Sequence, residues 1–140
     1  MEISIILAED NESDAKLLIQ ALTKKCMATL KIKHAFNGEE ALKVMLADHP
    51  VDLLITNLYM PRMGGRQLLR DMRDHLQFRK LPAIVLTNSD YNRDMEYCMK
   101  LQVNSYLLKP FDLAELNRVI EIINQIIEDI LADKSLKDCG

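Results

Sequence analysis

The stretch that decides the fold is Asp52-Leu-Leu-Ile-Thr-Asn-Leu-Tyr-Met-Pro-Arg-Met-Gly-Gly65. Its first half is nearly continuously apolar, which is typical of a strand that is buried on both faces. Its second half carries a proline and two glycines, which are typical of a loop. The strand is expected over Val51–Thr56, and four other short runs have the same character: Ile3–Ala8, Leu30–His34, Ala83–Thr87 and Ser105–Leu108. Such runs predict a parallel sheet.

Segments with helical spacing separate these runs, so that strand and helix alternate five times. Asn37 with Glu40, and Asp112 with Glu115, have the spacing of capping boxes and predict two helix starts. The alternation predicts an α/β, flavodoxin-like doubly wound sheet with strand order 2-1-3-4-5 and five helices, the last of them extended. We expect one domain over residues 1–132 and a polar tail over residues 133–140.

Composition narrows the classes of function. The chain has 140 residues and a net charge of −3, which gives no electrostatic reason to expect nucleic-acid binding. No apolar run approaches the length of a membrane span. The three cysteines have no metal-site spacing and are expected to be free thiols in a reducing compartment. These features predict a cytoplasmic protein without a nucleic-acid or membrane partner.

Polar residues follow four of the predicted strands. Glu9 and Asp10 follow the first strand, Asn57 the third, Thr87 ends the fourth and Lys109 follows the fifth. The carboxyl ends of parallel strands share one edge of a sheet, where ligands bind at the switch point. We therefore expect these five side chains to meet at one site.

The sequence resembles the receiver domains of two-component response regulators, including the stand-alone chemotaxis type, from Ile3 to about Ile127. The resemblance is carried by four segments, each at a strand end: Leu7–Asn11, Asp52–Pro61 with Met63–Gly65, Ile84–Ser89 and Tyr106–Phe111. It implies that Mg²⁺ is held by Glu9 and Asp10, with the backbone carbonyl of Tyr59 and the residue at position 57. Carboxylates and carbonyls are the oxygen ligands that this ion prefers.

The resemblance also assigns roles around the phosphoryl group. It implies that the Thr87 hydroxyl and the Lys109 amine contact an incoming phosphoryl group, and that Tyr106 is an aromatic switch. It implies a cis bond between Lys109 and Pro110. The implied partners are a sensor histidine kinase and a downstream protein.

Asn57 departs from the family pattern, which has aspartate as the phosphoacceptor. An amide is not a nucleophile of this kind, and it offers N–H donors in place of a second anionic oxygen. We expect no stable phosphoryl adduct and weakened Mg²⁺ binding, together with relief of repulsion from Glu9 and Asp10. Asn57 is either a substitution that blocks a working site or the mark of a natural pseudo-receiver that signals by binding alone.

The last predicted helix carries a heptad-like apolar stripe. Its steps of four and three residues are formed by Leu116, Ile120, Ile123, Ile127 and Ile130. Such a stripe either packs on the sheet or forms an interface. We expect a homodimer or partner interface through it.

An enzyme on this fold is the weaker hypothesis. The chain has no glycine-rich phosphate loop, and no Ser/His/Asp or Cys/His set falls on the predicted strand ends. We expect a signalling module that is not an enzyme and acts through protein–protein contact. Its output surface is expected on the fourth helix, fifth strand and fifth helix.

Overall fold

The structure is a computed structural model that describes residues 2–47 and 50–139. A five-stranded parallel sheet lies at its centre in the order β2-β1-β3-β4-β5. The class and strand order predicted from the sequence are therefore confirmed. The strands are β1 (Glu2–Ala8), β2 (Thr29–Ala35), β3 (Leu53–Thr56), β4 (Ala83–Thr87) and β5 (Ser105–Leu108).

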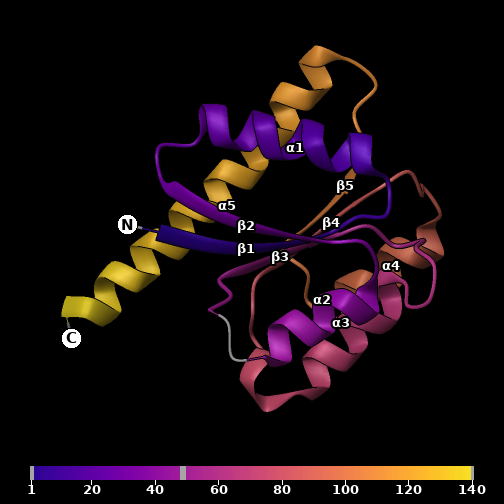
Figure 1. The fold of residues 1–140 in the computed structure, drawn as a ribbon, viewed down its shortest axis with the longest axis horizontal. Coiled ribbons are helices and arrows are strands. Elements are labelled where there is room, and N and C mark those ends of the chain that lie inside the picture. The colour runs from indigo at the N-terminus through magenta and orange to yellow at the C-terminus, as the bar shows by residue number, and fades with distance from the viewer. Residues whose placement is uncertain (1, 48–49, 140) are drawn as a thin grey trace.

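Helices cover both faces of the sheet (Figure 1). On one face lie α1 (Glu12–Lys25) and α5 (Leu113–Cys139). On the other lie α2 (Gly38–Leu46), α3 (Gly65–Asp74) and α4 (Asn92–Lys100), with a short 3₁₀ turn at Leu76–Phe78. Among the described helices, none is both long and apolar enough to cross a membrane.

The core has two layers because the central strands are covered on both faces. All four residues of β3 and all five of β4 are buried. Alternate side chains of β1 point to opposite layers, so that Ile5 packs against α1 and α5 while Ile6 packs against α2 and α3. This double burial explains why the apolar runs in the sequence are continuous.

Side-chain caps fix two helix starts as the sequence predicts. The Asn37 side chain accepts from the backbone N–H of Glu40 at 2.9 Å, and the Asp112 side chain accepts from Glu115 at 2.8 Å. Each cap satisfies a backbone donor that the helix leaves free. Asn11 begins α1 in the same way, at 3.0 Å from the N–H of Asp14.

The expectation of an interface along the stripe of α5 is wrong for three of its residues. Ile120, Ile123 and Ile127 are at most 1% exposed, because they pack on the sheet within this chain. Leu116 and Ile130 are partly buried against the same layer. The heptad-like spacing therefore serves a long helix that lies along a sheet.

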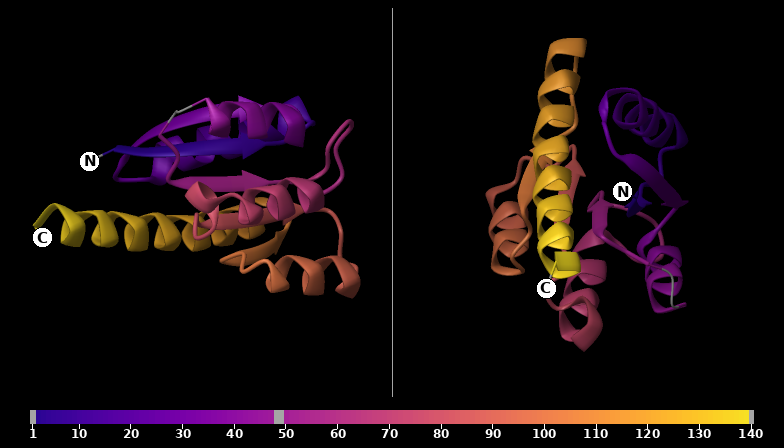
Figure 2. Two further views of the ribbon diagram at one scale, coloured as in Figure 1. Left: turned by 90° about the horizontal axis from the view of Figure 1, so that it is seen from below. Right: turned by 90° about the vertical axis from the view of Figure 1, so that its left-hand side faces the viewer.

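The polar tail expected over residues 133–140 is helical as far as the structure describes it, because α5 continues to Cys139; residue 140 lies outside the described residues. The helix extends past the amino-terminal ends of the strands (Figure 2). Lys134 holds this extension: its amine lies 2.9 Å from Asp52 Oδ2 and 3.2 Å from the carbonyl of Glu2. Asp52 in turn accepts from the backbone N–H of Ser4 at 2.8 Å.

Gly65 lets α3 begin directly against the end of β3. A Cβ atom at this position would lie 2.1 Å from the carbonyl oxygen of Asn57 and 3.0 Å from Cα of Leu58. Both contacts are with backbone, which cannot swing aside as a side chain can. The close approach of α3 to the backbone of Asn57 therefore requires glycine at position 65.

We expect Gly65→Ala to destabilise the chain by about 1–3 kcal/mol through this clash. Helix propensity alone would predict the opposite sign, since alanine is better than glycine by about 1 kcal/mol in a helix. Urea unfolding followed by circular dichroism measures the difference, with the exposed Gln67→Ala on the same helix as control. An unchanged or increased stability for Gly65→Ala would contradict the assigned packing.

Candidate functional site

The polar residues predicted to meet do converge at the carboxyl edge of the sheet. One surface pocket is lined by Asp10, Asn57, Thr87 and Lys109, together with Tyr59. Glu9 lies beside it, buried to 3% exposure, and its carboxylate contacts both Asn57 and Lys109. The strand order brings these side chains together, because β1 lies beside β3 and β3 beside β4.

The amide of Asn57 has one defined orientation. Its Oδ1 accepts from the backbone N–H of Leu58 at 2.8 Å. Its Nδ2 therefore faces the acidic pair and lies 3.2 Å from Glu9 Oε2 and 3.4 Å from Asp10 Oδ1. An aspartate in this position would turn an anionic oxygen toward the same two carboxylates, a repulsion that the amide converts into attraction.

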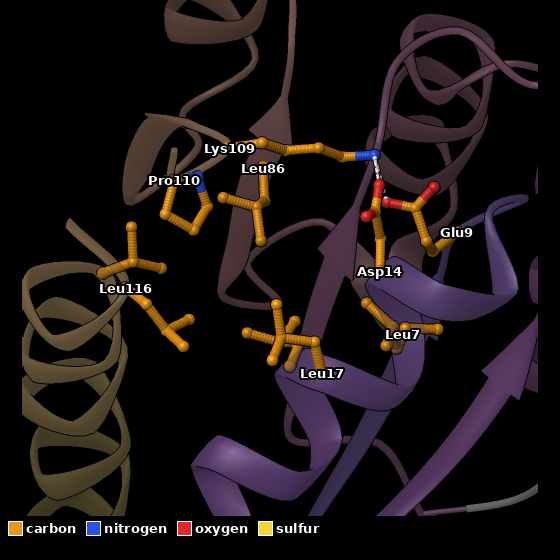
Figure 3. Close-up of a pocket in the computed structure, with 11 residues that line it drawn as sticks. Leu7, Glu9, Asp14, Leu17, Leu86, Lys109, Pro110 and Leu116 are labelled. Atoms are coloured by element: carbon orange, nitrogen blue, oxygen red, sulfur yellow. Dashed lines mark hydrogen bonds and ion pairs between the residues drawn. The ribbon is translucent and has the colours of Figure 1, made fainter. Parts of the chain in front are cut away.

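Lys109 reaches across the sheet edge to two carboxylates (Figure 3). Its amine lies 2.8 Å from Glu9 Oε1 and 2.7 Å from Asp14 Oδ2. Burial opposes the charge of Lys109, but the hydrogen bonds to Asp14 and Glu9 outweigh it and raise the pKa of the amine. Burial raises the pKa of Glu9 despite the contact with Lys109.

The donor set fits a hard divalent cation only in part. Glu9, Asp10 and the backbone carbonyl of Tyr59 offer oxygen of the kind that Mg²⁺ prefers. In the part of the chain that the structure describes, no three acidic, histidine or cysteine side chains form a metal cluster. The expected ligand Asn57 presents its N–H groups to the acids, since its oxygen is bonded to Leu58. The Asn57 side-chain oxygen is therefore not turned toward the two acids.

The other predicted site residues lie around the same pocket. Thr87 is 1% exposed, and its hydroxyl accepts from the backbone N–H of Ser89 at 3.3 Å. Tyr106 donates from its hydroxyl to the carbonyl of Ser89 at 2.9 Å. No cis peptide bond occurs among the described residues, so the expected cis bond between Lys109 and Pro110 is wrong; trans is the favoured isomer of such bonds in the absence of other constraints.

A buried carboxylate that the sequence did not indicate lies behind the pocket. Asp94 is 2% exposed, and its Oδ2 accepts from the hydroxyls of Tyr59 and Ser89, each at 2.6 Å. Its Oδ1 lies 3.6 Å from the guanidinium of Arg66. Burial raises the pKa of Asp94, but the hydrogen bonds from Ser89 and Tyr59 and the positive charges of Arg66 and Arg93 outweigh it, so the pKa lies below its ordinary value.

Asp14 is the second residue that sequence reasoning missed. It lies in the first turn of α1, where an acidic residue is ordinarily explained by the helix dipole. Its spacing three residues after the cap Asn11 gave no signal that it would contact Lys109. Asp94 is likewise an acid in the first turn of α4, and only the packing of that helix brings it to Tyr59 and Ser89.

Comparison with known proteins finds one family over most of the chain. The family model described as "Response regulator receiver domain" matches residues 5–121. The rice protein "Two-component response regulator ORR7" from Oryza sativa subsp. indica is 24% identical over 114 residues, which cover 81% of this chain and 52% of the rice protein. The chain thus spans about half the length of that curated relative.

Solved structures show the same fold over most of the chain. The phosphorylated cyanobacterial phytochrome response regulator RcpA superposes with a TM-score of 0.80 at 25% identity, covering 95% of this chain and 96% of that chain. The Mn²⁺-bound form of response regulator Rcp1 superposes with a TM-score of 0.76 at 25% identity, covering 84% and 88%. The likeness therefore spans nearly the whole of both solved chains.

We expect Asn57→Asp to lower the stability of the metal-free chain by about 1–3 kcal/mol, because a third carboxylate replaces an N–H donor beside Glu9 and Asp10. Added Mg²⁺ should restore part of the loss. Calorimetry in EDTA and in Mg²⁺ measures both effects. Asn57→Ala is the control, since it also loses the hydrogen bonds to Glu9 and Asp10 but adds no charge, and it should gain less from Mg²⁺ than Asn57→Asp does. An equal or higher melting temperature for Asn57→Asp in EDTA would contradict the expectation.

The lowered pKa of Asp94 predicts an acid-dependent stability. A carboxyl with a depressed pKa contributes stability above its unfolded pKa of about 3.9 and loses it as the pH falls through the folded value. Asp94→Asn should therefore cost about 1–3 kcal/mol at pH 7 and clearly less near pH 3. Urea unfolding at both values tests this, with the exposed Asp90→Asn in the same loop as control. The same cost at both pH values would exclude an ionised Asp94 as the source.

Proposed function

Because the chain belongs to the response regulator receiver domain family, we propose that it is a receiver module of two-component signalling in which Asn57 blocks phosphorylation. Its output is protein–protein contact. The observation that carries the proposal is the position of the Asn57 amide, between Glu9 and Asp10 in the pocket that Thr87 and Lys109 also line. The proposal includes no catalytic reaction on another molecule, and it assigns the module to the cytoplasm, where free thiols such as Cys26 and Cys98 stay reduced.

The pocket has the charges that phosphoryl transfer to a carboxylate requires, except for the nucleophile. Lys109 and the Thr87 hydroxyl are the two donors proposed for phosphoryl oxygens. Mg²⁺, held by Glu9, Asp10 and the Tyr59 carbonyl when bound, would neutralise negative charge there. Related Rcp1 is described as Mn²⁺-bound, which supports a divalent ion. Asn57 has no anionic oxygen with which to attack phosphorus.

The proposed output surface is formed by α4, β5 and the start of α5. It exposes six large apolar side chains: Tyr91, Met95, Met99, Leu108, Phe111 and Leu113. Phe111 is 91% exposed. Apolar groups gathered on a surface mark contact sites for partners. The proposed partners are a sensor histidine kinase, as phosphoryl donor to an aspartate-containing form, and a downstream protein that binds this surface.

A specific observation favours a second candidate, a natural pseudo-receiver that binds its partner without phosphorylation. Each polar atom of the Asn57 side chain has a partner: Oδ1 accepts from Leu58, while Nδ2 donates toward Glu9 and Asp10. The pocket is thus internally compensated without a cation or a phosphoryl group. A stable single state of this kind suits a constitutive binding module.

Restoring the acceptor tests the proposal. The chain with Asn57 and its Asn57→Asp variant are incubated with a small phosphodonor and Mg²⁺, and the mass of each is measured by mass spectrometry. We expect the mass increment of one phosphoryl group in Asn57→Asp alone, because only it has a carboxylate nucleophile.

Thr87→Ala in the Asn57→Asp background is the control and should gain phosphate more slowly. Partner binding that changes on phosphorylation favours the blocked regulator, and unchanged binding favours the pseudo-receiver. Phosphorylation of the chain with Asn57, or an Asn57→Asp chain that stays unmodified, would contradict the assigned pocket.

A further inference from the structure

We propose that Asp94 is a positioning residue that couples the loop after β3, through Ser89, to the orientation of Tyr106. Asp94 has the burial and the contacts for this task. Its two oxygens are shared among three side chains from different elements: Tyr59 from the loop after β3, Ser89 from the loop after β4, and Arg66 from α3. It lies on α4, which it thereby joins to both loops.

The connection from Tyr59 to Tyr106 consists of three hydrogen bonds. Tyr59 donates to Asp94 Oδ2 at 2.6 Å, and Ser89 donates from its hydroxyl to the same oxygen at 2.6 Å. The backbone carbonyl of Ser89 accepts from the hydroxyl of Tyr106 at 2.9 Å. The Ser89 hydroxyl also accepts from the N–H of Tyr91 at 3.4 Å, which fixes the start of α4.

The chemistry of the shared oxygen makes these contacts interdependent. Each hydroxyl has a single proton, and both protons point at Oδ2, which accepts two charge-assisted hydrogen bonds. Loss of one donor leaves a buried anion with less compensation, so the carboxylate must shift toward its remaining partners. Arg66 restricts that shift from the other side, because its guanidinium also stacks over the ring of Tyr97, 4.2 Å from the centroid. The displacement is therefore directed to Ser89.

The coupling gives the candidate cation site a route to the output surface. Tyr59 supplies the backbone carbonyl that we proposed as a ligand, and Tyr106 lies on β5, within the surface that we proposed for partners. This part of the inference rests on the proposed function, whereas the coupling between Tyr59 and Tyr106 does not. A free-energy coupling between two sites acts equally in both directions. A partner that holds Tyr106 would thus also order the loop of Tyr59.

The first experiment uses the 140-residue chain with Asn57, without metal. Tyrosine rings are labelled with ¹³C, and the minor-state population of Tyr106 is measured by NMR relaxation dispersion. Each of Tyr59→Phe and Asp94→Asn should raise that population about fivefold, because the first removes the hydrogen bond from Tyr59 and the second removes the negative charge that both hydroxyls face. The double variant should show no further rise, since both changes interrupt the same connection. Tyr91→Phe, which removes an exposed ring hydroxyl nearby, is the matched control and should leave Tyr106 unchanged.

The outcomes separate coupling from simple support of the fold. A structural role alone would lower the melting temperature in both single variants while Tyr106 kept its natural population, and this would overturn the proposal. Additive effects in the double variant would overturn it as well, because they would mean independent routes to Tyr106. The readout is spectroscopic and needs only folded protein. If Asp94→Asn fails to fold, Tyr59→Phe still provides the test, because it removes only a hydroxyl group from a half-exposed ring.

The second experiment adds Mg²⁺ in the Asn57→Asp background and follows the same Tyr106 resonance. Mg²⁺ should shift it, and Tyr59→Phe in that background should reduce the shift at least threefold. A shift of full size with Tyr59→Phe would overturn the coupling. No Mg²⁺ response in Asn57→Asp itself would contradict the proposed cation site, while the metal-free result would still decide the coupling.

Discussion

The single hydrogen bond from the N–H of Leu58 to Oδ1 of Asn57 determines the character of the candidate site. It fixes which end of the amide faces the acidic pair, and so decides that N–H groups rather than oxygen meet Glu9 and Asp10. The backbone that supplies this N–H is itself held in place, because Gly65 packs against the carbonyl of Asn57 where no side chain fits. Asn57 therefore takes part both in the packing of α3 against β3, through its backbone, and in the charge balance of the site, through its amide.

The same constraint organises the rest of the pocket. With the amide turned toward the acids, Glu9 and Asp14 share the ammonium group of Lys109. Three carboxylates lie in or beside the pocket, those of Glu9, Asp10 and Asp14, and the Lys109 amine and the Asn57 amide donate to them. A receiver with aspartate at position 57 would carry an additional negative charge here, and a cation would compensate it. In the chain with Asn57, the amide nitrogen already donates toward these acids.

Much of the fold and of the site could be predicted because both follow from local sequence patterns and topology. The buried runs of β3 and β4 define the sheet centre, and parallel order alone brings Glu9, Asn57, Thr87 and Lys109 to one edge. The orientation of the amide, the pairing of Lys109 with Asp14 and the burial of Asp94 could not be predicted. They depend on side-chain rotamers and on how far α1 and α4 lie from the strand ends, which no spacing in the sequence encodes. The apolar stripe of α5 was wrongly expected to form an interface for a related reason. A heptad-like pattern is the same whether the apolar face packs on a sheet or on another helix.

The extension of α5 has a mechanical consequence. Lys134 joins the helix to Asp52 and to the carbonyl of Glu2 at the start of β1, so the helix is attached to the sheet as far as this residue. If a second domain were fused after Cys139 through a continuous helix, that helix would leave the molecule on the side opposite the pocket. Each residue inserted into the helix would rotate the fused domain by about 100° and move it about 1.5 Å along the helix axis. The number of residues in the helical linker would thus set the orientation of the fused domain relative to the sheet.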